Sequence, residues 1–267
     1  MDAERFSNRE GINPVQKPLA RGTRSKLLYS IKLMYDRWCS LGLVKENPTS
    51  GIVKYSKDPE RPRSKLPREA LERLFPRTHG ELVRVWGSSM WGALMLVLWD
   101  TGARPGEVRA LKWEDYYPEE RFIPLRRAIE SGTADTIKGT KNEVIKPGYL
   151  QVRTAQELSI WRAESQFNGD QEFMFNVTGK SPVSNAAIGD AFQRALGRLG
   201  YDGTGWTPYW LRHSFVTYAL ESLDDSEVIM LAGHSSMQMS QNYRHPDDEI
   251  ILKRSKGIRE KLDAARE

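Results

Sequence analysis

The chain has 267 residues, enough for a substantial hydrophobic core and for two domains, because a single core usually stops growing near this size. Charged residues make up 28% and hydrophobic residues 39%, a balance typical of a globular protein and not of a disordered one. No apolar run approaches the roughly 20 residues of a membrane span, and no apolar stretch follows the first residues as in a secretory signal. We therefore expect a cytoplasmic protein.

Cysteine and histidine usage argues against a structural metal. The single cysteine, Cys39, has no internal disulfide partner and is expected to be a small buried core residue. The four histidines have no cysteine partners at metal-binding spacing, and they are His79, His213, His234 and His245. We expect no zinc and no cofactor.

The net charge of +5 is distributed unevenly along the chain. Residues 1–67 hold 14 Lys/Arg and 7 Asp/Glu, a net +7, which leaves 26 and 28, a net −2, for residues 68–267. A basic N-terminal quarter favours nucleic acid as a partner, because neutralising phosphates releases counterions. A solvated basic face remains the alternative if the charge is considered alone.

The N-terminal part predicts an arm, one clear helix and a linker. Residues 1–20 contain Gly11, Pro14 and Pro18 and little periodicity, which indicates an extended arm. From Thr23, apolar residues recur at helical spacing up to a glycine stop at Gly42. Basic residues and prolines then alternate. We therefore predict a first domain with its arm at 1–58, a basic linker at 59–67 and a second domain at 68–267. A plain solvated linker remains the alternative to one that tracks a phosphate backbone.

Beyond the linker, the chain predicts mainly helices. One begins near Leu66, and a second, at 87–100, is apolar nearly all round and suits the centre of a domain. Residues 101–111, Thr-Gly-Ala-Arg-Pro-Gly-Glu-Val-Arg-Ala-Leu, then place Arg104 at the start of the next helix, where backbone N–H groups favour a phosphate. Glu107 is expected to orient Arg104 or to cap this turn.

Residues 122–149 change character and predict a β-hairpin. Short strands are expected at 135–138 and 143–145, with a basic turn at 139–142 between them. The remainder predicts further helices, at about 154–166, 184–200, 208–222, 225–233 and 247–264.

Two motifs in the last third carry chemistry. Residues 206–215 hold the pair Arg212-His213, and residues 231–243, Leu-Ala-Gly-His-Ser-Ser-Met-Gln-Met-Ser-Gln-Asn-Tyr, run from a glycine-histidine pair to Tyr243. A phenol is a poor nucleophile at neutral pH, so one that reacts needs a phosphate held by cations and a route for its proton. Tyr218 is a weaker candidate, because it lies on the predicted helix of Arg212 and is expected in the core.

Arg104, Arg212, His234 and Tyr243, in this order and with these flanks, closely resemble the tyrosine recombinase (phage integrase) family over roughly residues 20–250. The resemblance implies a mainly α fold with a small β-sheet (α+β), in which a catalytic domain follows a short helical DNA-binding segment. It also implies double-stranded DNA as the partner, a homo-oligomer that is a tetramer on two DNA sites, and a nucleoid-associated location. A type IB topoisomerase shares the chemistry but fits residues 231–236 less well.

The same resemblance implies site-specific recombination without metal or ATP. Tyr243 would attack a DNA phosphodiester and form a 3′-phosphotyrosyl bond, while Arg104, Arg212 and His234 stabilise the added negative charge. Residues 138–147, Lys-Gly-Thr-Lys-Asn-Glu-Val-Ile-Lys-Pro, resemble the family's β-hairpin, whose lysine protonates the leaving 5′ oxygen. We assign that role to Lys138, with Lys141 as the rival.

Two departures from the family pattern keep a second function open. The residue three before Arg212 is most often histidine in the family, and here it is Tyr209, which can contact a phosphate but is a weaker base. The N-terminal helical part is also short. The alternative is a catalytically weak DNA-binding protein of this fold with an architectural or regulatory role. Whether the C-terminal helix docks on its own domain or on a neighbouring protomer is left open by the sequence.

Overall fold

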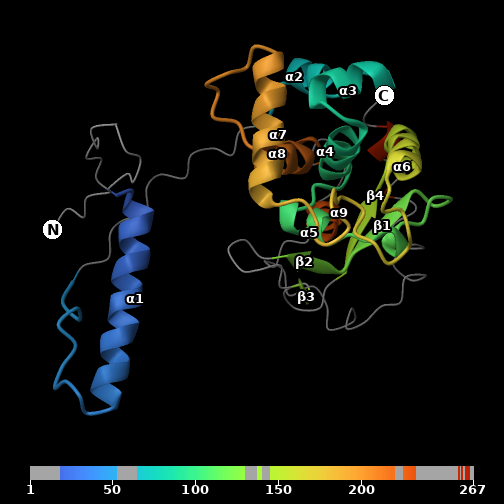
Figure 1. Cartoon of the computed structure of the whole chain (residues 1–267). Coiled ribbons are helices and arrows are strands. Elements are labelled where there is room, and N and C mark those ends of the chain that lie inside the picture. The colour runs from blue at the N-terminus through green and yellow to red at the C-terminus, as the bar shows by residue number, and fades with distance from the viewer. Residues whose placement is uncertain are drawn as a thin grey trace. The chain divides into compact units, whose positions relative to one another are not determined.

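The computed structural model describes residues 19–52, 65–129, 137–139, 145–219, 225–232, 258, 260 and 262–264. The chain divides into two compact units, residues 1–62 and 63–267 (Figure 1). The architecture is mostly helical with two small antiparallel sheets, which confirms the predicted fold class. The predicted linker 59–67 lies mainly outside the described residues, so the domain boundaries stay predictions.

The first unit is built on α1 (Arg21–Ser40), close to the helix expected from Thr23. The chain leaves the helix through Gly42, whose φ of 69° is left-handed, and the Asn47 amide then donates to the Lys32 carbonyl at 3.1 Å. No residue of α1 is buried within the described structure. The prediction for Cys39 was therefore wrong: its side chain is half-buried, because α1 buries none of its residues within the described part of the chain.

The second unit contains the remaining helices. Their bounds are α2 (Arg68–Leu74), α3 (His79–Trp86), α4 (Ser89–Thr101), α5 (Pro105–Arg109), the 3₁₀ turn η1 (Trp113–Asp115), α6 (Val152–Glu164), α7 (Asn185–Arg198), α8 (Tyr209–Ala219) and α9 (Asp225–Ala232). The helices expected from periodicity in this part of the chain exist within a few residues of their predicted bounds. Of the helix expected at 247–264, residues 258, 260 and 262–264 are described, and they are helical.

Helix α4 lies at the centre of the second unit, as its all-round apolar sequence predicted (Figure 1). The Ser88 hydroxyl caps its first turn by accepting from the Trp91 N–H at 3.3 Å. Helices α3, α6 and α8 pack against it, and Leu94, Met95 and Leu98 are almost fully buried. Each such side chain contributes roughly 1.5–3 kcal/mol through burial, so α4 is a rigid base for the turn that follows it.

By length and apolar composition, no single helix in the described ranges could cross a membrane. Helices α3 and α4 pass that test only as a pair bent by 94°.

The strand pairing differs from the predicted hairpin. Strand β1 (Phe122–Leu125) pairs antiparallel with β4 (Lys146–Tyr149), and β2 (Arg127–Ile129) pairs antiparallel with β3 (Ile137–Gly139). Of the predicted hairpin of 135–138 with 143–145, residues 135, 136, 143 and 144 lie outside the described residues. Residues 137 and 138 pair with β2, and residue 145 precedes β4 without belonging to a strand.

The described C-terminal residues pack on their own catalytic unit. Ile258 and Leu262 are buried in a cluster with Phe122, Tyr149 and Phe215. Asp263 adds an ion pair with Arg121 at 3.4 Å. In this structure of one chain, the described residues of the segment contact the unit that precedes them.

Candidate active site

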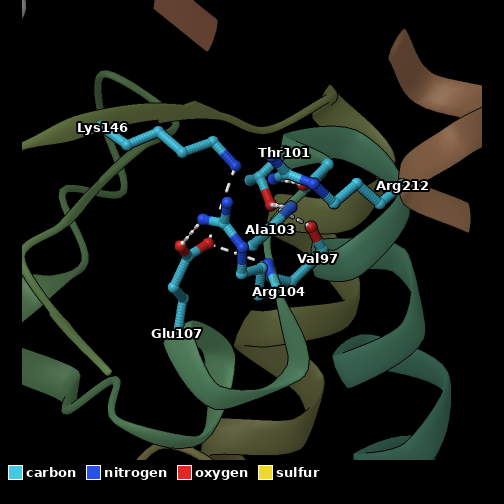
Figure 2. Close-up of polar contacts among 8 residues, drawn as sticks. Val97, Thr101, Ala103, Arg104, Glu107, Lys146 and Arg212 are labelled. Atoms are coloured by element: carbon cyan, nitrogen blue, oxygen red, sulfur yellow. Dashed lines mark hydrogen bonds and ion pairs between the residues drawn. The ribbon is translucent and has the colours of Figure 1, made fainter. Parts of the chain in front are cut away.

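The turn between α4 and α5 organises the candidate site (Figure 2). The Thr101 hydroxyl donates to the Val97 carbonyl at 2.6 Å and accepts from the Ala103 N–H at 3.2 Å, which fixes the end of α4. Gly102 follows in the left-handed region with φ of 56°, and a Cβ there would lie 2.3 Å from the Phe215 ring. Only glycine fits without displacing that ring, and the turn directs Arg104 to the start of α5.

Glu107 holds Arg104 by both its backbone and its side chain. The Arg104 N–H donates to Glu107 Oε2 at 2.8 Å, and Arg104 Nη1 donates to Oε1 at 2.9 Å. Glu107 thus fills both of its expected roles, orienting the arginine and capping the turn. Because Glu107 accepts from the Arg104 N–H, this one backbone donor at the start of α5 is already paired within the protein. The Arg104 side chain stays 47% exposed.

Arg212 reaches the same turn from α8. Its side chain is buried, and Nη1 donates to the Gly102 carbonyl at 2.6 Å, across 110 positions of sequence. Figure 2 shows its guanidinium pointing toward Thr101 and the segment of Arg104. The fold therefore brings together two of the predicted site residues. Two arginines that approach one turn favour a phosphate oxyanion there, since a guanidinium stays charged at any working pH.

Lys146 is a site residue that sequence reasoning missed. It opens β4, its side chain is buried, and Nζ lies 3.8 Å from Glu107 Oε2. Figure 2 shows the ammonium pointing toward Arg104 and Glu107. The available signal was a lysine between Ile145 and Pro147, within a short apolar strand where a charge is costly.

Burial and neighbouring charges shift two pKa values in this cluster. Burial, against the opposing effect of Glu107 and with added repulsion from Arg212 and Arg104, lowers the pKa of Lys146 to about 7. Burial alone would raise the pKa of Glu107, but Lys146 and the bonds from Arg104 outweigh it and the pKa is lowered. Glu107 is therefore ionised at neutral pH, whereas Lys146 titrates close to it.

The described part of the chain shows no group of three or more His, Cys, Asp or Glu side chains arranged to hold a metal ion.

Comparison with known proteins agrees with this arrangement. The model of the phage integrase family matches residues 85–249, more than half of the chain, and this span includes Arg104, Lys146 and Arg212. The chain belongs to the phage integrase family. Tyrosine recombinase XerC of Neisseria gonorrhoeae (strain ATCC 700825 / FA 1090) is 26% identical over 93% of this chain and 77% of the relative. The chain is thus a tyrosine-type site-specific recombinase by class.

A further relative and two solved structures are also similar to this chain. Tyrosine recombinase XerD of Corynebacterium glutamicum is 27% identical over 57% of this chain and 47% of its own. A Tn1549 transposon integrase in complex with a circular intermediate DNA superposes with a TM-score of 0.65 at 17% identity, covering 90% of this chain and 80% of that one. The XerA recombinase gives 0.52 at 20% identity, with 90% and 77% covered. These structures share the fold.

The other predicted site residues are described in part or not at all. Lys138 lies in β3 opposite Ala128, and its side chain is outside the described part. Lys141, His234 and Tyr243 also lie outside the described residues. Their assignments, like the roles of the two arginines, stay predictions.

Two tyrosines of α8 have different surroundings. Tyr209, at the family's usual histidine position, opens α8 and is 49% exposed. The Tyr218 hydroxyl donates to the Leu66 carbonyl at 2.9 Å, and the Lys65 ammonium lies 4.3 Å from its ring centroid. Tyr218 is therefore held in a structural role, although its side chain is partly buried against the core and not fully within it as expected.

Proposed function

We propose that this recombinase cuts and rejoins double-stranded DNA through a 3′-phosphotyrosyl intermediate on Tyr243. The observation that carries the proposal is the convergence of Arg104 and Arg212 on one turn, where Arg212 Nη1 bonds the Gly102 carbonyl. Arg104 follows two residues later with a half-exposed side chain. The half-exposed guanidinium of Arg104 and the buried guanidinium of Arg212, which is bonded to the same turn, suit the non-bridging oxygens of a phosphodiester.

The chemistry follows from these cations. Tyr243 Oη attacks phosphorus, the bond from phosphorus to the 5′ oxygen breaks, and the phenolic proton leaves to a base or to water. Arg104, Arg212 and His234 stabilise the negative charge that develops on the phosphate. Lys138 protonates the leaving 5′ oxygen. The tyrosyl ester retains the energy of the broken bond, so a second 5′ hydroxyl reverses the step and joins another strand.

Assembly and location follow from the same reaction. Exchange between two DNA sites needs four active sites, so we expect a tetramer on two duplexes. The XerC and XerD relatives and the DNA-bound integrase structure support DNA as the partner. A chain that works on chromosomal or mobile-element DNA is cytoplasmic and nucleoid-associated.

Trapping of a covalent adduct tests the proposal. The substrates are nicked duplexes from the DNA flanking the gene, in which loss of a short fragment after cleavage prevents religation. With the intact chain and no metal, we expect a denaturation-resistant protein–DNA adduct. Tyr243→Phe keeps DNA binding and loses the adduct, because the phenolic oxygen forms the bond.

Tyr218→Phe is the matched control, since it removes a tyrosine hydroxyl that the fold uses for the Leu66 carbonyl. It is expected to keep the adduct. An undiminished adduct in Tyr243→Phe would reject Tyr243 as nucleophile. Binding without any adduct by the intact chain, on a duplex shown to contain its site, would favour the architectural function and direct attention to Tyr209.

A further inference from the structure

Lys146 is a charged residue at a buried position, where an apolar side chain would lower the free energy of folding more. It is 3% exposed, and its Nζ makes no hydrogen bond with any residue that the structure describes. Glu107 Oε2, 3.8 Å away, is an ion-pair partner beyond hydrogen-bond length. Burying an ammonium without acceptors is costly, whereas its strand partner Leu125 is a buried apolar residue. The position therefore keeps lysine for its charge.

In this cluster, the carboxylate of Glu107 lies among three cationic side chains. Glu107 accepts from Arg104 at 2.8 and 2.9 Å and pairs with Lys146 at 3.8 Å, while Arg212 lies close enough to lower the pKa of Lys146. With Lys146 protonated, the four groups carry a net charge of +2. The site is therefore short of negative charge until an anion arrives.

We propose that Lys146 is a positioning residue of the recombinase site: its ammonium neutralises Glu107, so that the charge of Arg104 is available to the DNA phosphate. The inference rests on the proposed function for the identity of that phosphate. Without the ammonium, Glu107 and Arg104 form a neutral pair, and the field that Arg104 exerts on a phosphate is weakened. Lys146 thus acts through Arg104.

Phosphate binding and the protonation of Lys146 are then coupled. The groups facing Lys146 are Glu107 and Arg104 on α5 and Arg212 on α8. Both arginines stay charged and Glu107 stays ionised, so Lys146 is the member of this set that titrates near neutral pH. A bound phosphate supplies negative charge and raises the pKa of Lys146 above its free value of about 7.

The sign of the pH dependence follows from that shift. Because the pKa is higher in the bound state, the protein takes up a proton on binding between the two pKa values, and phosphate affinity falls as pH rises through that window. Below about pH 7 Lys146 is protonated in both states, so its contribution to affinity is constant.

Calorimetry measures this proton directly. The full chain carrying Tyr243→Phe binds the nicked duplex without cleaving it, and the binding heat is compared at pH 8 in two buffers of different ionisation enthalpy. We expect this protein to take up roughly one proton more than the same protein with Lys146→Met. Lys112→Met, which removes a lysine bonded to Gln171 outside the cluster, is the matched control and keeps the uptake. Equal uptake with and without Lys146 would overturn the inference.

A second variant covers the case in which Lys146→Met does not fold. Lys146→Arg keeps the positive charge but does not titrate near neutral pH, so it is expected to bind the duplex at pH 8 at least as tightly as the parent and to take up no extra proton. Proton uptake equal to that of the parent would overturn the inference.

The cleavage rate distinguishes positioning from proton donation. On a substrate with a sulfur leaving group at the 5′ bridging position, Lys146→Met should stay slow, because a thiolate needs no acid but still needs Arg104. Rescue by sulfur would overturn the positioning role. Loss of uptake in Lys146→Met without any cleavage by the intact chain would instead count against the proposed function alone.

Discussion

Tyr209 stands three residues before Arg212, where the resemblance to the family leads us to expect histidine. It opens α8 and is 49% exposed, so its hydroxyl has room to meet a phosphate. A phenol donates a hydrogen bond but does not share a proton near neutral pH as histidine does. We therefore expect retained phosphate contact with weaker acid–base assistance.

Tyr209→His should therefore accelerate cleavage, by up to about 100-fold, the lower range for a positioned proton-transfer group. Single-turnover adduct formation on the nicked substrate measures the rate. Tyr209→Phe, which removes only the hydroxyl, is the control and should be slower than the parent. A slower Tyr209→His would mean that the phenol is adapted to its surroundings.

Among elements, the turn from α4 to α5 matters most, because its backbone supplies the carbonyl that Arg212 binds. The glycine-arginine spacing predicted that one helix ends and the next begins here, and both do. The requirement for glycine has a second cause that lies on α8, where the Phe215 ring occupies the space of a Cβ. Local propensity and tertiary packing agree at this position.

Gly102→Ala should destabilise the protein by roughly 2–4 kcal/mol, since alanine pays for the left-handed conformation and also displaces Phe215. Urea unfolding followed by circular dichroism measures the loss. Gly189→Ala, inside α7 with nothing within 4 Å of the added Cβ, is the matched control. It should gain about 0.5–1 kcal/mol. Equal stabilities of the two variants would contradict the packing constraint.

For the molecule as a whole, the C-terminal segment completes the second unit from within the same chain. Ile258 and Leu262 close the cluster around Phe122 and Phe215, the ring that also confines Gly102. Packing of the C-terminal segment is thereby connected, through Phe215, to the turn that carries Arg104 and binds Arg212.

Leu262→Ala should lower the free energy of unfolding by about 2–5 kcal/mol, the usual cost of truncating a buried leucine. The measured Tm should not depend on protein concentration, because the contact is intramolecular. Glu260→Ala changes an exposed residue of the same segment and should have an effect within about 0.5 kcal/mol. A Tm that rises with concentration in the parent protein would indicate docking between protomers instead.

The sequence by itself determined the class of fold, the existence of most helices and the pairing of Arg104 with Glu107, because these depend on periodicity, capping and contacts within one turn. It also marked Arg212 through its flanking motif. Only the tertiary structure decided the strand partners, the half-buried state of Cys39 and the place of Lys146. Strand pairing and burial depend on segments far apart in the chain, and a short apolar strand with one lysine does not indicate which carboxylate or guanidinium the fold will bring beside it.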